Sequence, residues 1–394
     1  MKTAIVIGAG IAGCSTAYAL AQRDINVTLL ERHTHIAAEA SGNPLAMLYP
    51  RLSGDNHLSQ FALAGYLHTL QLLRELTLSK TAFDACGLLQ LGFNARESAR
   101  IKKIANQEHE AFRLVAKSEA SRLAGISLDD DALYFPDTGW LQPTALCKRL
   151  SQHKNISIYT LNNAVKILKN NNIFKLLCGD DIVFEADIIV ICNSNDALEF
   201  SQSSHIKTKA VRGQITQLAA TEQSKKLKMV ICADGYLSPA VDSKHSLGAT
   251  FSADNLDLAV IEADHLANLN TLKTISESLY LDLKNNINSG RATFRCTTPD
   301  YFPLVGQLLD AESLRAKPPR PNAKFKSLPW LADLYINVAH GSRGYTSAPL
   351  CAELLACLIC NEPLPVSKEL AGLLNPNRFL LREMGLKKLA RTYT

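Results

Sequence analysis

The sequence predicts an α/β fold in which an antiparallel β-sheet interrupts the domain that contains both ends of the chain. Two segments support this, residues 4–23 and 334–360, and in each an apolar run leads through a glycine-rich turn into a helical pattern. Between them, residues 206–294 alternate short apolar runs with one helical stretch, which is typical of an antiparallel sheet with helices. At 394 residues, the chain is long enough for two hydrophobic cores.

The first of these segments matches a dinucleotide-binding motif. Its glycines, Gly8, Gly10 and Gly13, have G-x-G-x-x-G spacing, and Glu31 ends the next apolar run. Gly8 lets the chain turn, Gly10 lets a pyrophosphate approach the backbone, and Gly13 lets the helix pack on the sheet. Glu31 lies where an acid accepts from ribose hydroxyls and disfavours a 2′-phosphate, so the motif favours FAD or NAD over NADP.

The second segment is predicted to offer backbone N–H groups to the same cofactor. An apolar strand over 334–338 runs into His340-Gly341-Ser342-Arg343-Gly344-Tyr345, and a helix is predicted over 347–360. The apolar run at 187–192 is predicted to return to the first sheet, which makes the dinucleotide-binding domain discontinuous.

The elements predicted between the two glycine turns determine where we expect the two domains to begin and end. Amphipathic helices are predicted over 97–123 and 257–284. The dinucleotide-binding domain is predicted to comprise 1–85, 136–205 and 295–394, and a substrate domain 86–135 and 206–294.

The net charge of +5 is partly local. Residues 315–326 contain five Lys and Arg and no acid, and the C-terminal region is also basic, through Arg378, Arg382, Lys387, Lys388 and Arg391. Such stretches bind polyanions or are simply solvated, and the sequence leaves both interpretations open.

Other features limit the location and the chemistry. No apolar run reaches membrane-spanning length and no signal peptide precedes the first strand, so we expect a soluble, cytoplasmic protein. Most of the ten cysteines lie in apolar stretches, which predicts reduced core thiols, and core packing is also favoured for Cys357-x-x-Cys360. No His, Cys and Asp cluster suggests a metal site.

Further motifs carry a resemblance over essentially the whole chain, and they lie at 40–43 with 48–50, 234–237, 295–306, 341–353 and 374–378. Together with the glycine turns, they resemble the D-amino-acid oxidase and glycine oxidase superfamily, and within it the FAD-dependent half of the bifunctional MnmC family. The resemblance implies FAD as the cofactor and a D-amino-acid oxidase-like fold. That fold is a Rossmann-like FAD-binding domain with an interposed antiparallel β-sheet substrate domain.

The resemblance also implies an activity, that of an FAD-dependent oxidoreductase acting on a CH–NH group. It would remove the carboxymethyl group from 5-carboxymethylaminomethyl-(2-thio)uridine at the tRNA wobble position, giving 5-aminomethyl-(2-thio)uridine and glyoxylate. The tRNA is then the partner, with phosphate contacts from 315–326 and the basic tail. Methyl transfer to the product is expected from a separate protein or from a domain outside this chain. Two alternatives stay open: an oxidase of a free small amine such as glycine or sarcosine, and a nucleotide-binding module without turnover.

Three side chains are candidates for the chemistry. By resemblance, Arg295 binds the substrate carboxylate, and the alternative is a salt bridge between domains. Arg343 is expected beside the flavin, touching flavin or substrate, or else it fixes the loop. Tyr236 resembles a substrate-side tyrosine, with a plain sheet residue as the alternative. No dedicated base is expected, because the cofactor supplies the difficult chemistry.

The remaining predictions concern cofactor contacts. The backbone of Val165 resembles the position that meets the adenine. Residues 192–195 depart from the small-residue turn of the superfamily, so the approach to FAD there is expected to be looser or differently shaped. The full set of expected cofactor contacts is Gly8, Gly10, Ile11, Ala12, Gly13, Glu31, Arg32, Ser41, Gly42, Asn43, Met47, Leu48, Val165, Asn193, Gly341, Ser342, Arg343, Gly344, Tyr345 and Thr346.

Overall fold

The computed structural model describes residues 2–179, 182–253, 255–320 and 322–393. The chain forms two compact units. Unit 1 comprises residues 1–42, 144–210 and 295–394, and unit 2 comprises residues 43–143 and 211–294. Unit 1 is therefore built from three stretches of sequence, as a discontinuous domain requires.

Unit 1 is centred on a six-stranded sheet of order β19-β20-β13-β1-β2-β9 among the described residues. Its strands are β1 (Thr3–Ile7), β2 (Asn26–Leu30), β9 (Ile156–Tyr159), β13 (Ile188–Ile191), β19 (Leu304–Leu309) and β20 (Trp330–Val338). All neighbours are parallel except β19 and β20. Ile5 pairs with Ile189, so the predicted return of the 187–192 run to the first sheet is confirmed.

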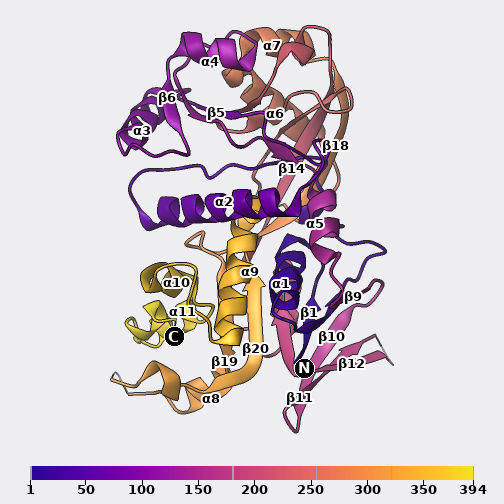
Figure 1. Ribbon diagram of the computed structural model, residues 1–394, viewed down its shortest axis with the longest axis vertical. Helices are drawn as coiled ribbons and strands as arrows, with labels where there is room; N and C mark the ends of the chain where they lie inside the picture. Colours follow the sequence, from indigo (N-terminus) through magenta and orange to yellow (C-terminus); the bar gives the residue numbers. More distant parts are fainter. Residues whose placement is uncertain (1, 180–181, 254, 321, 394) are drawn as a thin grey trace. The chain divides into compact units, whose positions relative to one another are not determined.

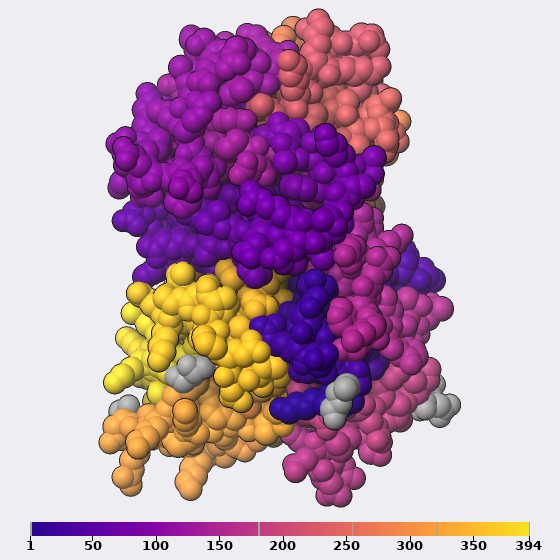
Figure 2. Space-filling model, viewed as in Figure 1, coloured from indigo at the N-terminus to yellow at the C-terminus, as the bar shows by residue number. Residues whose placement is uncertain are grey.

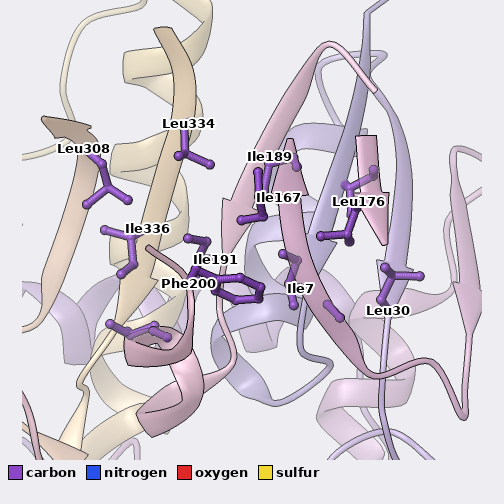
Figure 3. Close-up of a cluster of buried hydrophobic side chains, with 14 of the residues drawn as sticks. Ile7, Leu30, Ile167, Leu176, Ile189, Ile191, Phe200, Leu308, Leu334 and Ile336 are labelled. Atoms are coloured by element: carbon purple, nitrogen blue, oxygen red, sulfur yellow. The ribbon is translucent and has the colours of Figure 1, made fainter. Parts of the chain in front are cut away.

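The two faces of this sheet are covered differently. Helices α1 (Ile11–Ala21) and α9 (Gly344–Cys360) lie side by side on one face (Figure 1). The meander β10 (Ala164–Asn170), β11 (Ile173–Cys178) and β12 (Ile182–Ala186) covers the other. Figure 3 shows side chains of the sheet and of the meander meeting in one buried cluster, which makes this face the main core of unit 1.

The C-terminal part of unit 1 has a small core of its own. Its elements are α8 (Ala311–Ala316), η4 (Phe325–Ser327), α10 (Lys368–Leu374), α11 (Arg378–Glu383) and η6 (Leu389–Arg391). The buried residues of that core are Leu309, Leu314, Leu328, Leu380, Leu381, Leu386, Leu389 and Ala390. We call the region that they hold together, residues 309–328 and 378–393, the C-terminal lobe.

Arg378 corrects one expectation, because it is not a polyanion-facing residue. Its side chain is fully buried and forms a two-point ion pair with Asp300, through Nε at 2.9 Å and Nη2 at 2.6 Å. The guanidinium also donates to the backbone carbonyls of Phe302, Pro303 and Asn375. Arg378 therefore anchors the C-terminal lobe, and it is not available to a ligand.

Unit 2 is built on an eight-stranded sheet of order β18-β14-β17-β16-β15-β5-β7-β6 among the described residues. The strands are β5 (Leu88–Leu91), β6 (Arg113–Val115), β7 (Ala132–Phe135), β14 (Lys209–Ala219), β15 (Val230–Cys232), β16 (Tyr236–Leu237), β17 (Lys244–Gly248) and β18 (Ile287–Thr297). The pair β15–β5 is parallel, and the other pairs of known register are antiparallel. A short sheet joins β3 (Ala46–Met47), β8 (Trp140–Leu141) and β4 (Phe83–Asp84).

The helices of unit 2 correct two predictions. The predicted helix 97–123 is α3 (Ala95–Ala105), then β6, then α4 (Lys117–Ala124), because 113–115 pair with β7. The predicted helix 257–284 is α6 (Glu262–Ile275) and α7 (Glu277–Leu283). Ser276 separates them, since its extended backbone cannot continue α6 and its hydroxyl accepts from the N–H of Leu279 to cap α7. The helix α2 (His57–Leu76) begins after Asn56, whose side chain accepts from the N–H of Ser59.

The two units also differ from the predicted domain bounds. Residues 43–85 and 136–143 group with unit 2, although the prediction placed them with the dinucleotide-binding domain. Tyr66 of α2 packs edge-on against Phe135 at a ring distance of 6.0 Å, and Leu48 donates its N–H to Gly139 O. Which unit meets the substrate stays a prediction. No helix among the described residues is long and apolar enough to cross a membrane.

The Asp300–Arg378 pair generates a stability prediction. Burial alone would raise the pKa of Asp300, but the hydrogen bonds and charge of Arg378 outweigh it and lower that pKa. A lowered carboxyl pKa stabilises the fold above the unfolded pKa of about 3.9, and that contribution is lost as the pH falls through the folded pKa. Asp300→Asn should reduce the free energy of unfolding at pH 7 by about 3 kcal/mol, because it leaves a buried guanidinium without its counter-charge.

Urea titrations at pH 7 and pH 3 measure this effect, and the difference between variant and wild type should shrink at pH 3. The matched control is Asp137→Asn, whose ion pair with Arg74 is exposed and worth less than about 1 kcal/mol. Equal losses in the two variants would contradict the assignment.

Candidate cofactor site

The first glycine turn has no room for side chains at two of its three positions. Gly8 has a φ of +95°, and a Cβ there would lie 2.9 Å from the Cα of Asn193. A Cβ on Gly13 would lie 1.8 Å from the carbonyl oxygen of Gly8. Both glycines are therefore required by the turn itself, before any ligand is considered.

Gly10 differs, because the protein alone leaves space there. It precedes α1 with an extended backbone, and a Cβ would approach only Ser41, at 3.1 Å from Oγ. The N–H of Ile11, one of the first-turn groups without an intrahelical partner, donates to the same Ser41 Oγ at 2.9 Å. Ile11, Ala12 and Gly13 form the first turn of α1, and Ser41 and Gly42 lie in the short helix η1 (Ala40–Gly42). This helix N-terminus suits a pyrophosphate.

Glu31 links the first glycine turn to the loop that follows β2. Its carboxylate is buried and accepts from the N–H of Ala9 at 3.1 Å and from that of His33 at 3.0 Å. The sequence did not indicate these two contacts, because they depend on the folded path of the backbone. The predicted contact of Glu31 with the ribose stays a prediction.

Arg32 follows Glu31 and lies in a cluster of acids. It forms an ion pair with Glu39 and another with Asp196 at 2.7 Å, and Glu39 also contacts His33. Its guanidinium is thus engaged within unit 1, and its cofactor contact stays a prediction.

The second glycine turn lies directly against the first. Gly341 has a φ of +60°, and α9 begins at Gly344, three residues before the predicted start. A Cβ on Gly344 would lie 3.1 Å from Cγ2 of Ile11, so the N-termini of α1 and α9 meet. The buried hydroxyl of Tyr345 donates to the carbonyl of Ser41 at 2.7 Å and so ties η1 to the second turn.

The other predicted residues of this turn differ in exposure. Ser342 is exposed, Arg343 is half-buried, and Thr346 is buried in the first turn of α9. The two turns together place two positive helix ends at one point, which favours a bound anion.

His340 is a structural residue of the second turn. It lies between Ser347, whose Oγ is 3.0 Å from Nδ1, and Asn337, whose Oδ1 is 3.0 Å from Nε2. Asn337 in turn donates to Thr16 of α1. Burial lowers the pKa of His340 to about 3, so the ring is neutral and bridges β20 to α9.

Unpaired polar atoms lie beside the first turn. The side-chain carbonyls of Asn193 and Asn195 are buried and accept no hydrogen bond from the residues that the structure describes. Buried acceptors of this kind are normally satisfied, so these two suit a ligand that brings hydroxyl or amide donors. They lie in the segment in which the sequence departs from the superfamily.

Val165 lies at an irregularity of the meander. The pairing shifts between Ala164, opposite Cys178, and Lys166, opposite Leu177, so Val165 has no partner of its own in the ladder. Its side chain is half exposed. A backbone outside the ladder is free to meet a planar ring, and the adenine contact stays a prediction.

Arg295 lies in the part of β18 that belongs to unit 1. Thr297, two residues on and therefore on the same face of the strand, has its Cγ2 3.4 Å from the Cβ position of Gly341. Cys296 faces the core instead. Unit 1 thus directs the half-buried Arg295 to the side of the strand that touches the second glycine turn.

The other predicted residues belong to unit 2. Asn43 accepts from Arg291 at 2.8 Å, and Met47 is half-buried in β3. Leu48 is fully buried, and its backbone groups bond to Gly139 and to Thr138. Tyr236 is half-buried in β16. Their functional roles stay predictions.

Metal ligands are not a feature of the described part of the chain. No group of three or more His, Cys, Asp or Glu side chains there could hold an ion. All ten cysteines are free thiols, and Cys357 and Cys360 lie in α9.

Two glycine turns that meet at the carboxyl ends of a parallel sheet are typical of a dinucleotide-binding protein of the α/β class. The chain belongs to the FAD dependent oxidoreductase family (DAO), whose family model matches residues 3–358. It is thus an FAD-dependent oxidoreductase, and the predicted cofactor and fold class are confirmed.

Similar proteins agree with this assignment. The chain is 45% identical over 392 residues to a Methylobacillus flagellatus protein described as "tRNA 5-methylaminomethyl-2-thiouridine biosynthesis bifunctional protein MnmC". That match covers 98% of this chain and 61% of the relative, so the chain spans about three-fifths of the relative's length.

Two solved structures show the same fold. Glycine oxidase from Geobacillus kaustophilus matches with a TM-score of 0.75 at 18% identity, covering 92% of this chain and 96% of its own. L-proline dehydrogenase from P. horikoshii matches with a TM-score of 0.77 at 18% identity, covering 96% of this chain and 98% of its own.

The unequal crowding of the three glycines generates a prediction. Gly10→Ala should cost the apoprotein little stability, because the new methyl group meets only the hydroxyl of Ser41, which has to shift by a few tenths of an ångström. It should weaken FAD binding about tenfold or more, since the methyl group lies where the pyrophosphate approaches the backbone. Fluorescence titration of apoprotein with FAD and thermal melts measure the two effects.

Gly13→Ala is the matched comparison, and it should lower both stability and FAD content, because its Cβ collides with backbone. Unchanged FAD affinity in Gly10→Ala would place the pyrophosphate elsewhere.

Proposed function

We propose that this protein removes the carboxymethyl group from 5-carboxymethylaminomethyl-(2-thio)uridine at the tRNA wobble position, giving 5-aminomethyl-(2-thio)uridine and glyoxylate. The observation that carries the proposal is the 45% identity to the MnmC relative over 98% of this chain. Because that relative is described as bifunctional and is longer, we assign only the oxidative step to these residues. Methylation of the product amine then requires a separate protein or a domain outside them.

The chemistry needs a hydride acceptor and water. FAD, when bound, would supply the acceptor for a hydride from the carbon that joins the amine nitrogen to the carboxylate. The nitrogen lone pair forms the C=N bond of an imine, and the amine proton is released. Water adds to the imine carbon, and the C–N bond breaks to give the aminomethyl nucleoside and glyoxylate. The chain must therefore hold this carbon against the flavin and keep the amine neutral, and neither task requires a side-chain base.

Arg295 is our candidate for the carboxylate contact. A guanidinium binds a carboxylate through two parallel hydrogen bonds, which fixes orientation as well as charge. This assignment is supported by the position of Arg295 on the face of β18 that touches the second glycine turn. Arg343, inside that turn, is our candidate for a contact with the flavin or the substrate. Tyr236 belongs to unit 2, and its substrate contact stays a prediction.

The proposed substrate is a base in a folded RNA. A wobble nucleotide has to leave the stack of the anticodon loop to place its side chain against a flavin, as base-modifying enzymes generally require. We therefore propose tRNA as the partner and the cytoplasm as the place of action.

Anaerobic reduction of the flavin tests the proposal. The FAD-loaded protein is mixed with tRNA that carries the carboxymethylaminomethyl group, and the visible flavin band and glyoxylate are followed. Bleaching of the flavin band by this tRNA, together with formation of an equimolar amount of glyoxylate, supports the proposal. Bleaching by free glycine or sarcosine, without a response to tRNA, would establish the free-amine alternative. A flavin that no amine bleaches would leave only a nucleotide-binding module.

The carboxylate contact gives a second prediction. Arg295→Gln should lower kcat/KM for the modified tRNA about 10- to 100-fold, the usual effect of losing a charge-assisted hydrogen bond, with unchanged FAD content. On a substrate analogue without the carboxylate, the variant and wild type should react alike.

Arg96→Gln, at an exposed position of α3, is the matched control and should have no effect. An equal loss on both substrates would instead show that Arg295 is a structural ion-pair residue.

A further inference from the structure

We propose that the C-terminal lobe of unit 1 is a docking surface for the phosphate backbone of an RNA, at the opposite end of β19 from the second glycine turn. The proposal rests on the proposed function for the identity of the RNA. It depends on how the structure arranges two basic stretches that lie more than 50 residues apart in the sequence.

The lobe carries eight exposed cations: Arg315, Lys317, Arg320, Lys324, Lys326, Lys387, Lys388 and Arg391. None of the eight forms an ion pair with a residue that the structure describes. The other basic residues of the region are engaged, Arg378 and Arg382 with Asp300 and Lys207 with Glu383. The structure thus separates the cations that build the lobe from those that it leaves to solvent.

One small core brings both basic stretches together. Leu314 precedes Arg315, and Phe325, which packs against the core, lies between Lys324 and Lys326. In the second stretch, Leu386 and Leu389 flank the two lysines. Because these apolar residues share one core, the cations between them project from one lobe. Figure 2 shows the orange and yellow residues of the two stretches at the surface of unit 1.

The surroundings of His205 support this arrangement. Burial and then the nearby charge of Arg315 lower the pKa of His205. His205 lies 3.4 Å from Asn377, the residue that precedes α11. The charge of Arg315 is thus felt at a histidine that contacts the residue preceding α11.

The acids of the lobe leave this surface cationic. Asp310 caps α8 by accepting from Ser313, and Glu312 lies in the first turn of α8. Glu383 is paired with Lys207. A surface with eight unpaired cations and few free acids attracts a polyanion, and the regular phosphates of an RNA backbone match several such cations at once.

The lobe is well separated from the flavin-binding turns. Strands β19 and β20 pair Leu304 with Val338 near the second glycine turn and Leu309 with Trp330 at the lobe. The two pairs are five residues apart along β19, and at about 3.3 Å per residue this length of strand spans roughly 17 Å, because β20 bulges between them. The lobe would thus contact RNA outside the reacting nucleotide, so it should affect KM and leave kcat unchanged.

The test compares two triple variants with equal charge loss. Lys317, Lys324 and Lys388→Gln change the lobe, whereas Lys2, Lys148 and Lys154→Gln change exposed lysines elsewhere in unit 1. Binding of tRNA to the holoenzyme is measured against salt concentration, and turnover is measured on tRNA and on the free modified nucleoside.

We expect the lobe variant to bind tRNA about tenfold more weakly and to show a salt slope smaller by about 2, given about 0.7 to 0.9 per phosphate contact. Its kcat on tRNA and its activity on the nucleoside should equal those of wild type, and the control variant should bind as wild type does.

Two outcomes would overturn the proposal. One is equal tRNA affinity and salt slope in both variants, and the other is loss of binding to anionic lipid vesicles with unchanged tRNA binding. The binding measurement does not depend on turnover. If the protein binds tRNA but does not oxidise it, the proposed function is refuted, and the comparison of the two variants still tests the docking surface.

Discussion

The contact between the N-termini of α1 and α9 is the constraint on which unit 1 depends. Ile11 and Gly344 come so close that a methyl group on the glycine would touch the isoleucine. Both helices leave β-strands at the same edge of one parallel sheet, so their free N–H groups and positive ends face one region. The hydrogen bond from Tyr345 to the carbonyl of Ser41 then brings η1 to the same point. Two segments from opposite ends of the sequence thus meet at one candidate cofactor site.

Buried polar groups fix the shape of this candidate site through hydrogen bonds, and their protonation states do not change. Glu31, His340 and Tyr345 each bind backbone or neutral side chains. The neutral ring of His340 and the protonated hydroxyl of Tyr345, whose pKa burial raises, remain fixed hydrogen-bond partners across the physiological range. A site built in this way orients a cofactor and lets the cofactor do the chemistry, which fits an oxidoreductase that needs no dedicated base.

Local sequence patterns were sufficient to predict those elements of the fold that depend only on residues close together in the sequence. The glycine spacing, the apolar run at 187–192 and the late strand-turn-helix were all predicted, because each is fixed by residues within one turn or strand. The partners of Ser41, Glu31 and Arg378 were not, since each contact joins residues that only the folded chain brings together. The helix predicted over 97–123 was wrong for a related reason. Pairing of Arg113 to Val115 with β7 outweighs the helical periodicity, and only the sheet reveals it.

The ion pair between the buried Arg378 and the half-buried Asp300 connects the two proposed activities of unit 1. Asp300 follows β18, the strand of Arg295, by three residues and precedes β19, while Arg378 opens α11 of the C-terminal lobe. Because Arg378 also binds the carbonyls of Phe302 and Pro303, the lobe is fixed to the chain between those two strands. A rigid connection of this kind suits an enzyme whose substrate is held at one place and reacts at another, because the distance between the two must be constant. The same pair explains why the most deeply buried cation of a basic tail is not part of the basic surface: its charge holds that surface in place.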